Sequence, residues 1–257
     1  MILVRYTPGS LGNFFSSVLI NFKKNSNFLD YGGNKINSNS QNILHLYDEL
    51  DWEAEQRIKK RDYKIVNCNY AVSDNLLEQF VKNKYQIIFI ELKSNFIEYR
   101  LNYLYKHDPK YLKNSNDIFK KYHKRVFSYP DASYEAIRIF RLYQNVEQLQ
   151  VKKLKDDIVF DFSNFYIKPF KSWKINFIEL GKKINYEIAD LDFWYESFQG
   201  TQKPILIKTA QIKESIKEKK FLFNFSENEK GIVLGEYCLH NSIEENRFDE
   251  IYNKFSK

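Results

Sequence analysis

The residues of this chain with the clearest potential for chemistry lie within its first thirteen positions. Residues 7–13 are Thr-Pro-Gly-Ser-Leu-Gly-Asn, and they join the apolar run 2–6 to a second apolar run, 14–22. This order predicts a strand, a glycine-containing turn and a helix. Such a turn directs several backbone N–H groups and a helix N-terminus at one point, which suits a phosphate or a sulfate. The alternative is an ordinary corner, because short glycine motifs also occur by chance.

Two side chains further along are candidates for proton transfer. Glu91 lies near the end of the apolar run 85–92, two residues before Lys93, and parallel sheets bind their ligands at the carboxyl ends of their strands. Glu91 is therefore a candidate general base, or it forms an ion pair with a neighbouring lysine. His45 lies in the apolar run 43–47 and is the other candidate base. Its alternative is a structural histidine that packs beside apolar residues.

Charge and composition restrict the class of partner. The 257 residues carry a formal net charge of +7, which favours an anionic partner such as a nucleotide. Basic and acidic residues are interspersed, and the basic patches at 57–61 and 120–125 fit solvated helix faces at least as well as a nucleic-acid footprint. Nucleic acid is therefore the weaker expectation. The abundance of Lys, Asn, Phe and Tyr is typical of an AT-rich genome, so it carries no functional signal.

Other classes of site and location have little support in the sequence. Cys68 and Cys238 lie far apart without a CxxC partner, and the four histidines lack metal-ligand spacing, so we expect no metal site. The Walker A, dinucleotide-binding and G-x-S-x-G patterns are absent from the sequence. No window approaches the ~18 apolar residues of a membrane span, and the N-terminus has no signal pattern, so we expect a cytoplasmic protein.

The elements that must position these residues follow a repeating order. Strand patterns at 63–70, 85–92 and 158–162 join those of 2–6 and 43–47, although 43–47 also fits a helix edge. Helical patterns lie between and after them, at 51–61, 73–81 (capped by Ser73), 96–106 (capped by Ser94), 118–150, 170–184 and 191–198. Strands that alternate with helices predict an α/β fold with a mainly parallel sheet flanked by helices, in which the apolar 85–92 is an internal strand.

The sequence pattern changes beyond Pro204. A charged helix is expected at 211–220, and Ser242 with Glu245 has the pattern of a capping box that opens a last helix. We therefore predict a main domain over 1–204 and a C-terminal extension over 205–257. The extension either packs on the domain or mediates assembly, for example into a homo-oligomer.

In its order of elements, the chain resembles the sulfotransferases over roughly residues 1–204. The first loop of that family is approximately Pro-Lys-Ser-Gly-Thr-Thr, and residues 8–13 here are Pro-Gly-Ser-Leu-Gly-Asn. A second family motif places Arg after a strand and Ser about eight residues later, where this chain has Lys93 and Arg100. A later family strand ending in a Tyr-Glu-Asp-Leu type sequence is similar to 159–165.

The resemblance implies a function and a set of residues. It implies transfer of a sulfuryl group from 3′-phosphoadenosine 5′-phosphosulfate, without a metal, to a hydroxyl or amine acceptor whose identity the sequence does not specify. The 5′-phosphosulfate would be bound by backbone amides and one hydroxyl of the loop, from Gly9, Ser10, Gly12 and Asn13. Lys93 and Arg100 would bind the 3′-phosphate, since a buried dianion needs cationic partners.

The sequence also departs from that family in two places. Gly9 stands where the family has the lysine that neutralises the transferring group, and the run 67–69 has no histidine where the family has its base. His45 and Glu91 are the substitutes. The alternative prediction is a relative that kept the fold but lost the chemistry and serves as a binding or assembly protein.

Overall fold

The fold of this chain is described by a computed structural model. It describes residues 1–7, 9–21, 43–46, 51–59, 63–68, 73–93, 95–107, 136–137, 139–141, 153–167 and 169–257. The cap expected at Ser94 lies outside the described residues, as does most of the helix expected over 118–150. The chain divides into two compact units, one of residues 1–94 and 148–201 and the other of 95–147 and 202–257. The second unit thus contains the expected extension together with a middle segment of the chain.

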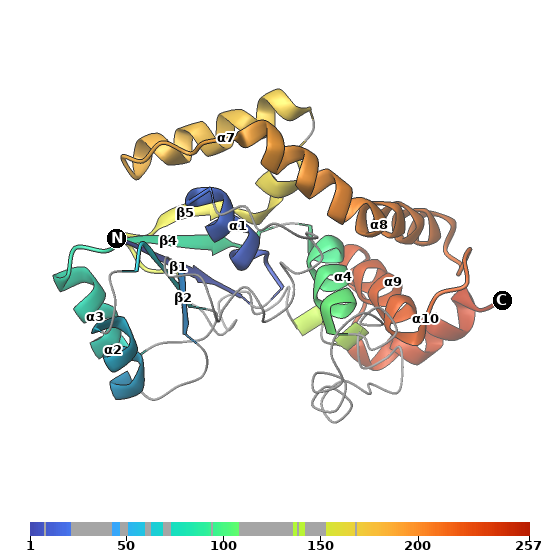
Figure 1. Ribbon diagram of the computed structural model, residues 1–257. Helices are drawn as coiled ribbons and strands as arrows, with labels where there is room; N and C mark the ends of the chain where they lie inside the picture. Colours follow the sequence, from blue (N-terminus) through green and yellow to red (C-terminus); the bar gives the residue numbers. More distant parts are fainter. Residues whose placement is uncertain are drawn as a thin grey trace, which may run out of the picture. The chain divides into compact units, whose positions relative to one another are not determined.

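The first unit is built on a five-stranded sheet in which every strand is parallel to its neighbours. Its strands are β1 (Ile2–Tyr6), β2 (Ile43–Leu46), β3 (Ile65–Cys68), β4 (Gln86–Glu91) and β5 (Ile158–Asp161). Their order across the sheet is β2-β3-β1-β4-β5, so β1 lies in the middle (Figure 1). The predicted α/β class with a parallel sheet is therefore confirmed. β4 is internal, as its apolar run predicts, because it pairs with β1 on one side and β5 on the other.

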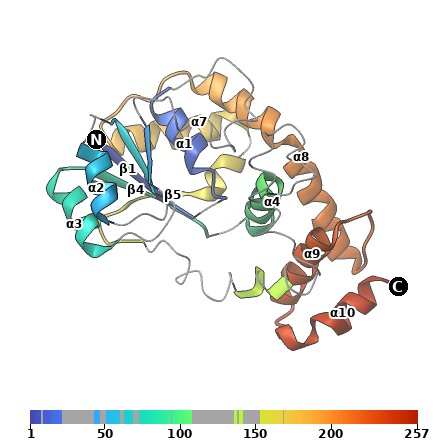
Figure 2. The same ribbon diagram turned by 60° about the horizontal axis from the view of Figure 1, so that its bottom comes forward.

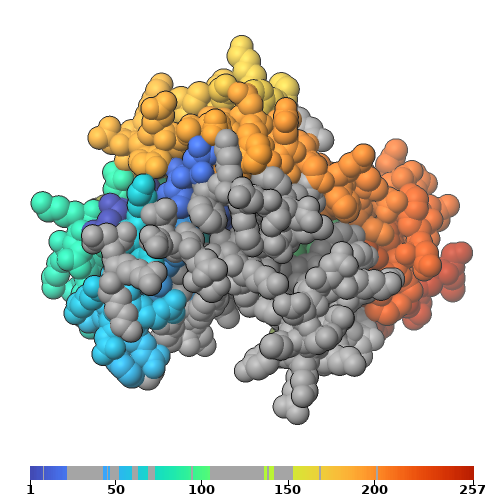
Figure 3. Space-filling view, in the orientation of Figure 1, coloured from blue at the N-terminus to red at the C-terminus, as the bar shows by residue number. Residues whose placement is uncertain are grey.

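Helices cover both faces of this sheet because alternate strand residues point to opposite sides. Figure 1 shows α1 (Gly12–Leu19) and α7 (Phe170–Lys183) on one face, with α2 (Asp51–Lys59) and α3 (Asp74–Lys82) on the other. α3 is capped by Ser73, whose hydroxyl accepts the N–H of Leu76 at 3.1 Å, as predicted. In the space-filling view the yellow-to-orange residues of α7 lie on the outer surface (Figure 3).

The two faces have different cores. The α2–α3 face is mostly aliphatic, with Leu3, Val66 and Ile87 packed against helix residues such as Leu76. The α1–α7 face is aromatic: Phe15 lies 4.9 Å from Phe160 and 6.1 Å from Phe177, measured between ring centroids. Tilted aromatic pairs of this kind contribute about 0.5–1.5 kcal/mol each beyond the area that they bury. Phe15 therefore fixes α1, and with it the turn before α1, against the sheet.

The second unit is helical. It contains α4 (Phe96–His107), the part of α8 (Leu191–Glu218) from residue 202 onward, α9 (Glu227–His240), the short η5 (Glu245–Arg247) and α10 (Phe248–Phe255). α4 packs against α9, and α9 against α10 (Figure 2). Their shared core includes Leu101, Ile232 and Phe248.

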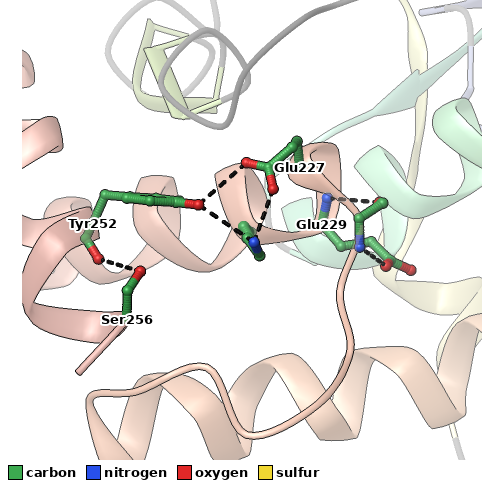
Figure 4. A network of polar contacts seen from close by, with 6 residues as sticks. Glu227, Glu229, Tyr252 and Ser256 are labelled. Atoms are coloured by element: carbon green, nitrogen blue, oxygen red, sulfur yellow. Dashed lines mark hydrogen bonds and ion pairs between the residues drawn. The ribbon is translucent and has the colours of Figure 1, made fainter.

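A polar network links α9 to α10 within this unit. The Nζ of Lys230 donates to Glu227 at 2.8 Å and to the hydroxyl of Tyr252 at 3.3 Å, and Tyr252 also donates to Glu227 (Figure 4). Lys230 lies 5.7 Å from the ring of Phe221, a cation–π distance. The network is structural because its charges are paired within the protein.

Two predictions for the C-terminal part are wrong in detail. The segments 191–198 and 211–220 are helical as expected, but they belong to one helix, α8, with Pro204 inside it. An interior proline costs about 3 kcal/mol, and buried residues on both sides of it, including Phe198 and Ile212, offset that cost. The capping box is also not at Ser242, which has φ 52°; it lies at Ser226 and Glu229, where it opens α9.

Two helical glycines give a matched test of packing in the two units. A Cβ at Gly235 of α9 would lie 2.8 Å from the Cβ of Ile139, whereas a Cβ at Gly200 of α8 would meet nothing within 4 Å. Gly235→Ala should therefore lower the free energy of unfolding by about 1–3 kcal/mol, since overpacking a core is destabilising. Gly200→Ala should raise it by about 0.5–1 kcal/mol, because alanine favours a helix over glycine. Urea unfolding measures both, and equal effects of the two changes would contradict the packing described.

Candidate functional site

The candidate site lies at the edge of the sheet where the strands end. From β1 the chain continues to β2 at one edge of the sheet, whereas from β4 it continues to β5 at the opposite edge. The connections that leave these two adjacent strands therefore diverge between β1 and β4. In open parallel sheets such a switch point forms the crevice where ligands bind.

The turn after β1 has an unusual backbone. Gly9 has φ 100° and Leu11 has φ 63°, so a left-handed residue stands directly before α1. The N–H of Ser10 donates to the carbonyl of Thr7 at 3.0 Å, which closes the turn. Leu11 is the N-cap of α1 and has no polar side chain for the first N–H groups of that helix. A turn that ends in a helix N-terminus of this kind attracts an anion through its backbone N–H groups.

Ser10 has a structural contact inside this turn. Its side chain is fully buried, and its hydroxyl donates to the carbonyl of Thr7 at 2.6 Å. The Ser10 hydroxyl is predicted to bind a phosphosulfate, but its hydrogen is donated to the backbone of the turn itself. What the turn offers to a ligand is its backbone amides.

Gly12 holds the turn against β1. A Cβ at this position would lie 2.2 Å from the ring of Tyr6, so only glycine lets the helix start so close to the strand. The hydroxyl of Tyr6 donates to the Oδ1 of Asn13 at 2.8 Å, and the Nδ2 of Asn67 donates to the same atom at 3.3 Å. Ser16 of α1 in turn donates to Asn67. The side-chain oxygen of Asn13 therefore joins β1, β3 and α1.

Charged side chains gather at the end of β4, next to this turn. Tyr6 pairs with Ile90, so Glu91 is the next residue along β4, level with Thr7. The Glu91 carboxylate forms one ion pair with Lys93 at 2.8 Å and a second with Lys153 at 3.7 Å. The hydrogen bond to Glu91 is the main cause that raises the pKa of Lys93, so Lys93 is cationic at neutral pH.

Lys153 is the site residue that sequence reasoning missed. It precedes β5 in the sequence, where a search restricted to residues after strands does not look, but its ammonium group lies beside Glu91 near the end of β4. A basic residue a few positions before a strand is too common a pattern to have indicated it.

His45 and Arg100 are placed as follows. The backbone of His45 lies in β2, opposite Asn67 of β3, and its side chain lies outside the described residues. Arg100 belongs to α4 in the second unit, is 3% exposed, and holds its guanidinium carbon 4.9 Å from the ring of Tyr103. The structure thus brings Glu91 and Lys93 together beside the turn, while Arg100 lies in the other unit.

A hollow in the first unit has no clear charge preference. Its volume is about 700 Å³, and it is lined by α7 and residues 185–192. Lys174 and Lys182 line it together with three acidic residues, and Lys174 pairs with Asp192 at 3.5 Å. Mixed charges of this kind favour no particular ion.

Comparisons with models of protein families, with curated proteins and with solved structures find no match to this chain. Within the described ranges, no three His, Cys, Asp or Glu side chains lie close enough together to hold a metal ion. No helix in the described part of the chain is long and apolar enough to cross a membrane.

The contact between Gly12 and Tyr6 can be tested by substitution and rescue. Gly12→Ala should lower the free energy of unfolding by about 1–3 kcal/mol, because the new methyl group overlaps a ring that cannot move without losing its bond to Asn13. Tyr6→Ala removes the ring, so the double variant should cost clearly less than the sum of the two single changes. Denaturant unfolding of the four proteins measures this coupling. Strict additivity would show that the two residues do not meet.

Proposed function

We propose that this chain binds 3′-phosphoadenosine 5′-phosphosulfate at the turn after β1 and transfers its sulfuryl group to a hydroxyl or an amine. The observation that carries the proposal is the position of this turn. It lies at the switch point between β1 and β4 of a parallel sheet and leads into a helix whose first N–H groups have no polar cap residue. The strand-and-helix order also supports a sulfotransferase-like fold.

The proposed roles of the residues follow from their chemistry. Backbone N–H groups of Gly9, Gly12 and Asn13 bind the 5′-phosphosulfate, while the N–H of Ser10 donates to Thr7 and closes the turn. Lys93 binds the 3′-phosphate. Ammonium groups form short, strong hydrogen bonds to phosphate oxygens.

The reaction needs little covalent chemistry from the protein. The acceptor oxygen or nitrogen attacks the sulfur, and the bond between the sulfur and the bridging phosphate oxygen breaks. Adenosine 3′,5′-bisphosphate leaves, and the proton of the acceptor passes to a base, for which Glu91 and His45 are the candidates. The N–H groups of the turn stabilise the negative charge that develops on the leaving phosphate.

A second candidate, a binding protein without transfer activity, is supported by three observations. Gly9 replaces the lysine of the family motif, the Ser10 hydroxyl is used within the turn, and Glu91 is already paired with lysines. The first candidate predicts nucleotide binding, whereas the second, a binding or assembly protein, does not require it. Only the first predicts release of the bisphosphate from the sulfated donor in the presence of an acceptor.

Adenosine 3′,5′-bisphosphate should stabilise the protein against unfolding. At about 100 times its dissociation constant, a ligand of the folded state adds about 2.7 kcal/mol, which gives a clear rise in Tm. Adenosine, which has no phosphate, should give no rise. Lys93→Ala should weaken the effect, whereas Lys82→Ala should not, because Lys82 pairs only weakly with Glu78, at 4.0 Å, on the exposed surface of α3. An unchanged Tm at millimolar bisphosphate would refute the proposal.

A further inference from the structure

The two lysines at the end of β4 are held by one carboxylate. Lys93 contacts one oxygen of Glu91 at 2.8 Å and Lys153 contacts the other at 3.7 Å. Glu91 is 15% exposed, while the side chains of Lys93 and Lys153 are 60% and 47% exposed. The carboxylate is thus the inner part of the cluster, and both ammonium groups face solvent.

The position of Lys153 is fixed by a buried ion pair next to it. Asp157 accepts the N–H of Leu154 at 2.7 Å and a guanidinium N–H of Arg5 at 2.8 Å, so the turn 154–157 is tied to the central strand β1. The side chains of Arg5 and Asp157 are 3% and 1% exposed. Burial raises the pKa of the Asp157 carboxyl, against the opposing effects of the Leu154 N–H and Arg5. A buried pair with these bonds resists separation, because either partner alone would be an uncompensated buried charge.

The cluster of Glu91 with two lysines leaves N–H donors available for an anion. Two ammonium groups at one place repel each other, and the Glu91 carboxylate between them offsets that repulsion. Each ammonium group has three N–H donors; Lys93 directs one to Glu91, and Lys153, at 3.7 Å, is paired with Glu91 beyond hydrogen-bond distance. The remaining donors are available to a ligand with several acceptor oxygens. Two further acids lie nearby: Asp157, which is paired with Arg5, and Asp161, which lies level with Glu91 in the sheet and has one oxygen that accepts the N–H of Ser163 at 2.8 Å.

We infer that Lys93 and Lys153 together bind the 3′-phosphate of the nucleotide, with Glu91 as the residue that positions both lysines. This inference rests on the proposed function and adds to it a cation from the segment before β5. The ligand group is a phosphate dianion, whose oxygens accept hydrogen bonds from both ammonium groups. Lys153 thereby supplies at this edge a positive charge that the turn, with Gly9 in place of a lysine, does not.

The test compares Lys153→Ala with Lys155→Ala by isothermal titration calorimetry. Both changes remove one positive charge from the same segment, but Lys155 is exposed two residues further on and has no ion pair among those of the described residues. Lys153→Ala should weaken binding of adenosine 3′,5′-bisphosphate at least about tenfold, as expected for a lost hydrogen bond to a charged group. It should change the affinity for adenosine 5′-phosphate less than about twofold. Lys155→Ala should change neither affinity by more than about twofold.

Two further variants complete the design. Lys153→Arg should retain most of the affinity, because the charge and donors are kept. In the double variant of Lys93 and Lys153, the loss in affinity should be smaller than the product of the single losses, since both lysines hold the same phosphate. Lys153 is half exposed, so these changes leave the buried Arg5–Asp157 pair intact.

The outcomes separate the inference from the proposed function. If the unaltered protein does not bind the bisphosphate, the proposed function fails. If it binds and Lys153→Ala binds equally well, the inference is wrong while the proposed function stands. If Lys153→Ala weakens both nucleotides equally, the lysines hold the 5′-phosphate, and the assignment to the 3′-phosphate is overturned.

Discussion

The close approach of Gly12 to the ring of Tyr6 is the contact on which the geometry of the candidate site depends. Tyr6 ends the central strand, and its ring occupies the space that any side chain at position 12 would need. Helix α1 can therefore begin directly above the end of β1, after a turn that requires positive φ at Gly9 and Leu11. Without this contact the first N–H groups of α1 would have no fixed direction. The anion site is thus a property of backbone placed by side-chain packing.

Buried polar groups give the site its rigidity, while its charges stay near the surface. Tyr6, Asn13, Asn67 and Ser16 form hydrogen bonds beneath the turn, and Arg5 with Asp157 ties the segment before β5 to β1. Buried polar groups whose partners are built in hold one arrangement, because breaking any bond leaves a costly unpaired group. The lysines above them remain accessible. The exposed lysines are well positioned because the backbone that carries them has already lost its conformational entropy on folding.

The sequence predicts the scaffold better than it predicts the site. Apolar runs such as 85–92 identify the strands, and Ser73 identifies the start of α3, because both signals are local. Ser242 and Pro204 mislead for the opposite reason: burial of residues such as Ile212 carries α8 through the proline, and the capping box forms at Ser226. Local patterns cannot weigh tertiary packing of this kind.

The side-chain contacts of the site join residues far apart in the chain. Arg5 meets Asp157 across 152 positions, and Asn13 meets Asn67 across 54. No local pattern in a single sequence indicates either contact. The turn at 7–13 and the pair Glu91 and Lys93 could be predicted because they are adjacent in the chain to strand ends. Lys153 could not, because only the path of the chain before β5 brings it to β4.

The central claim is that the backbone after β1 binds the phosphate of a nucleotide, and amide chemical shifts measure this most directly. In a ¹⁵N-labelled sample titrated with adenosine 3′,5′-bisphosphate, the N–H signals of Gly9, Ser10, Gly12 and Asn13 should move together with that of Lys93. Signals of α3 and of the hollow beside α7 should stay in place. Saturable shifts confined to residues 174–192, with those of the turn unchanged, would contradict the account.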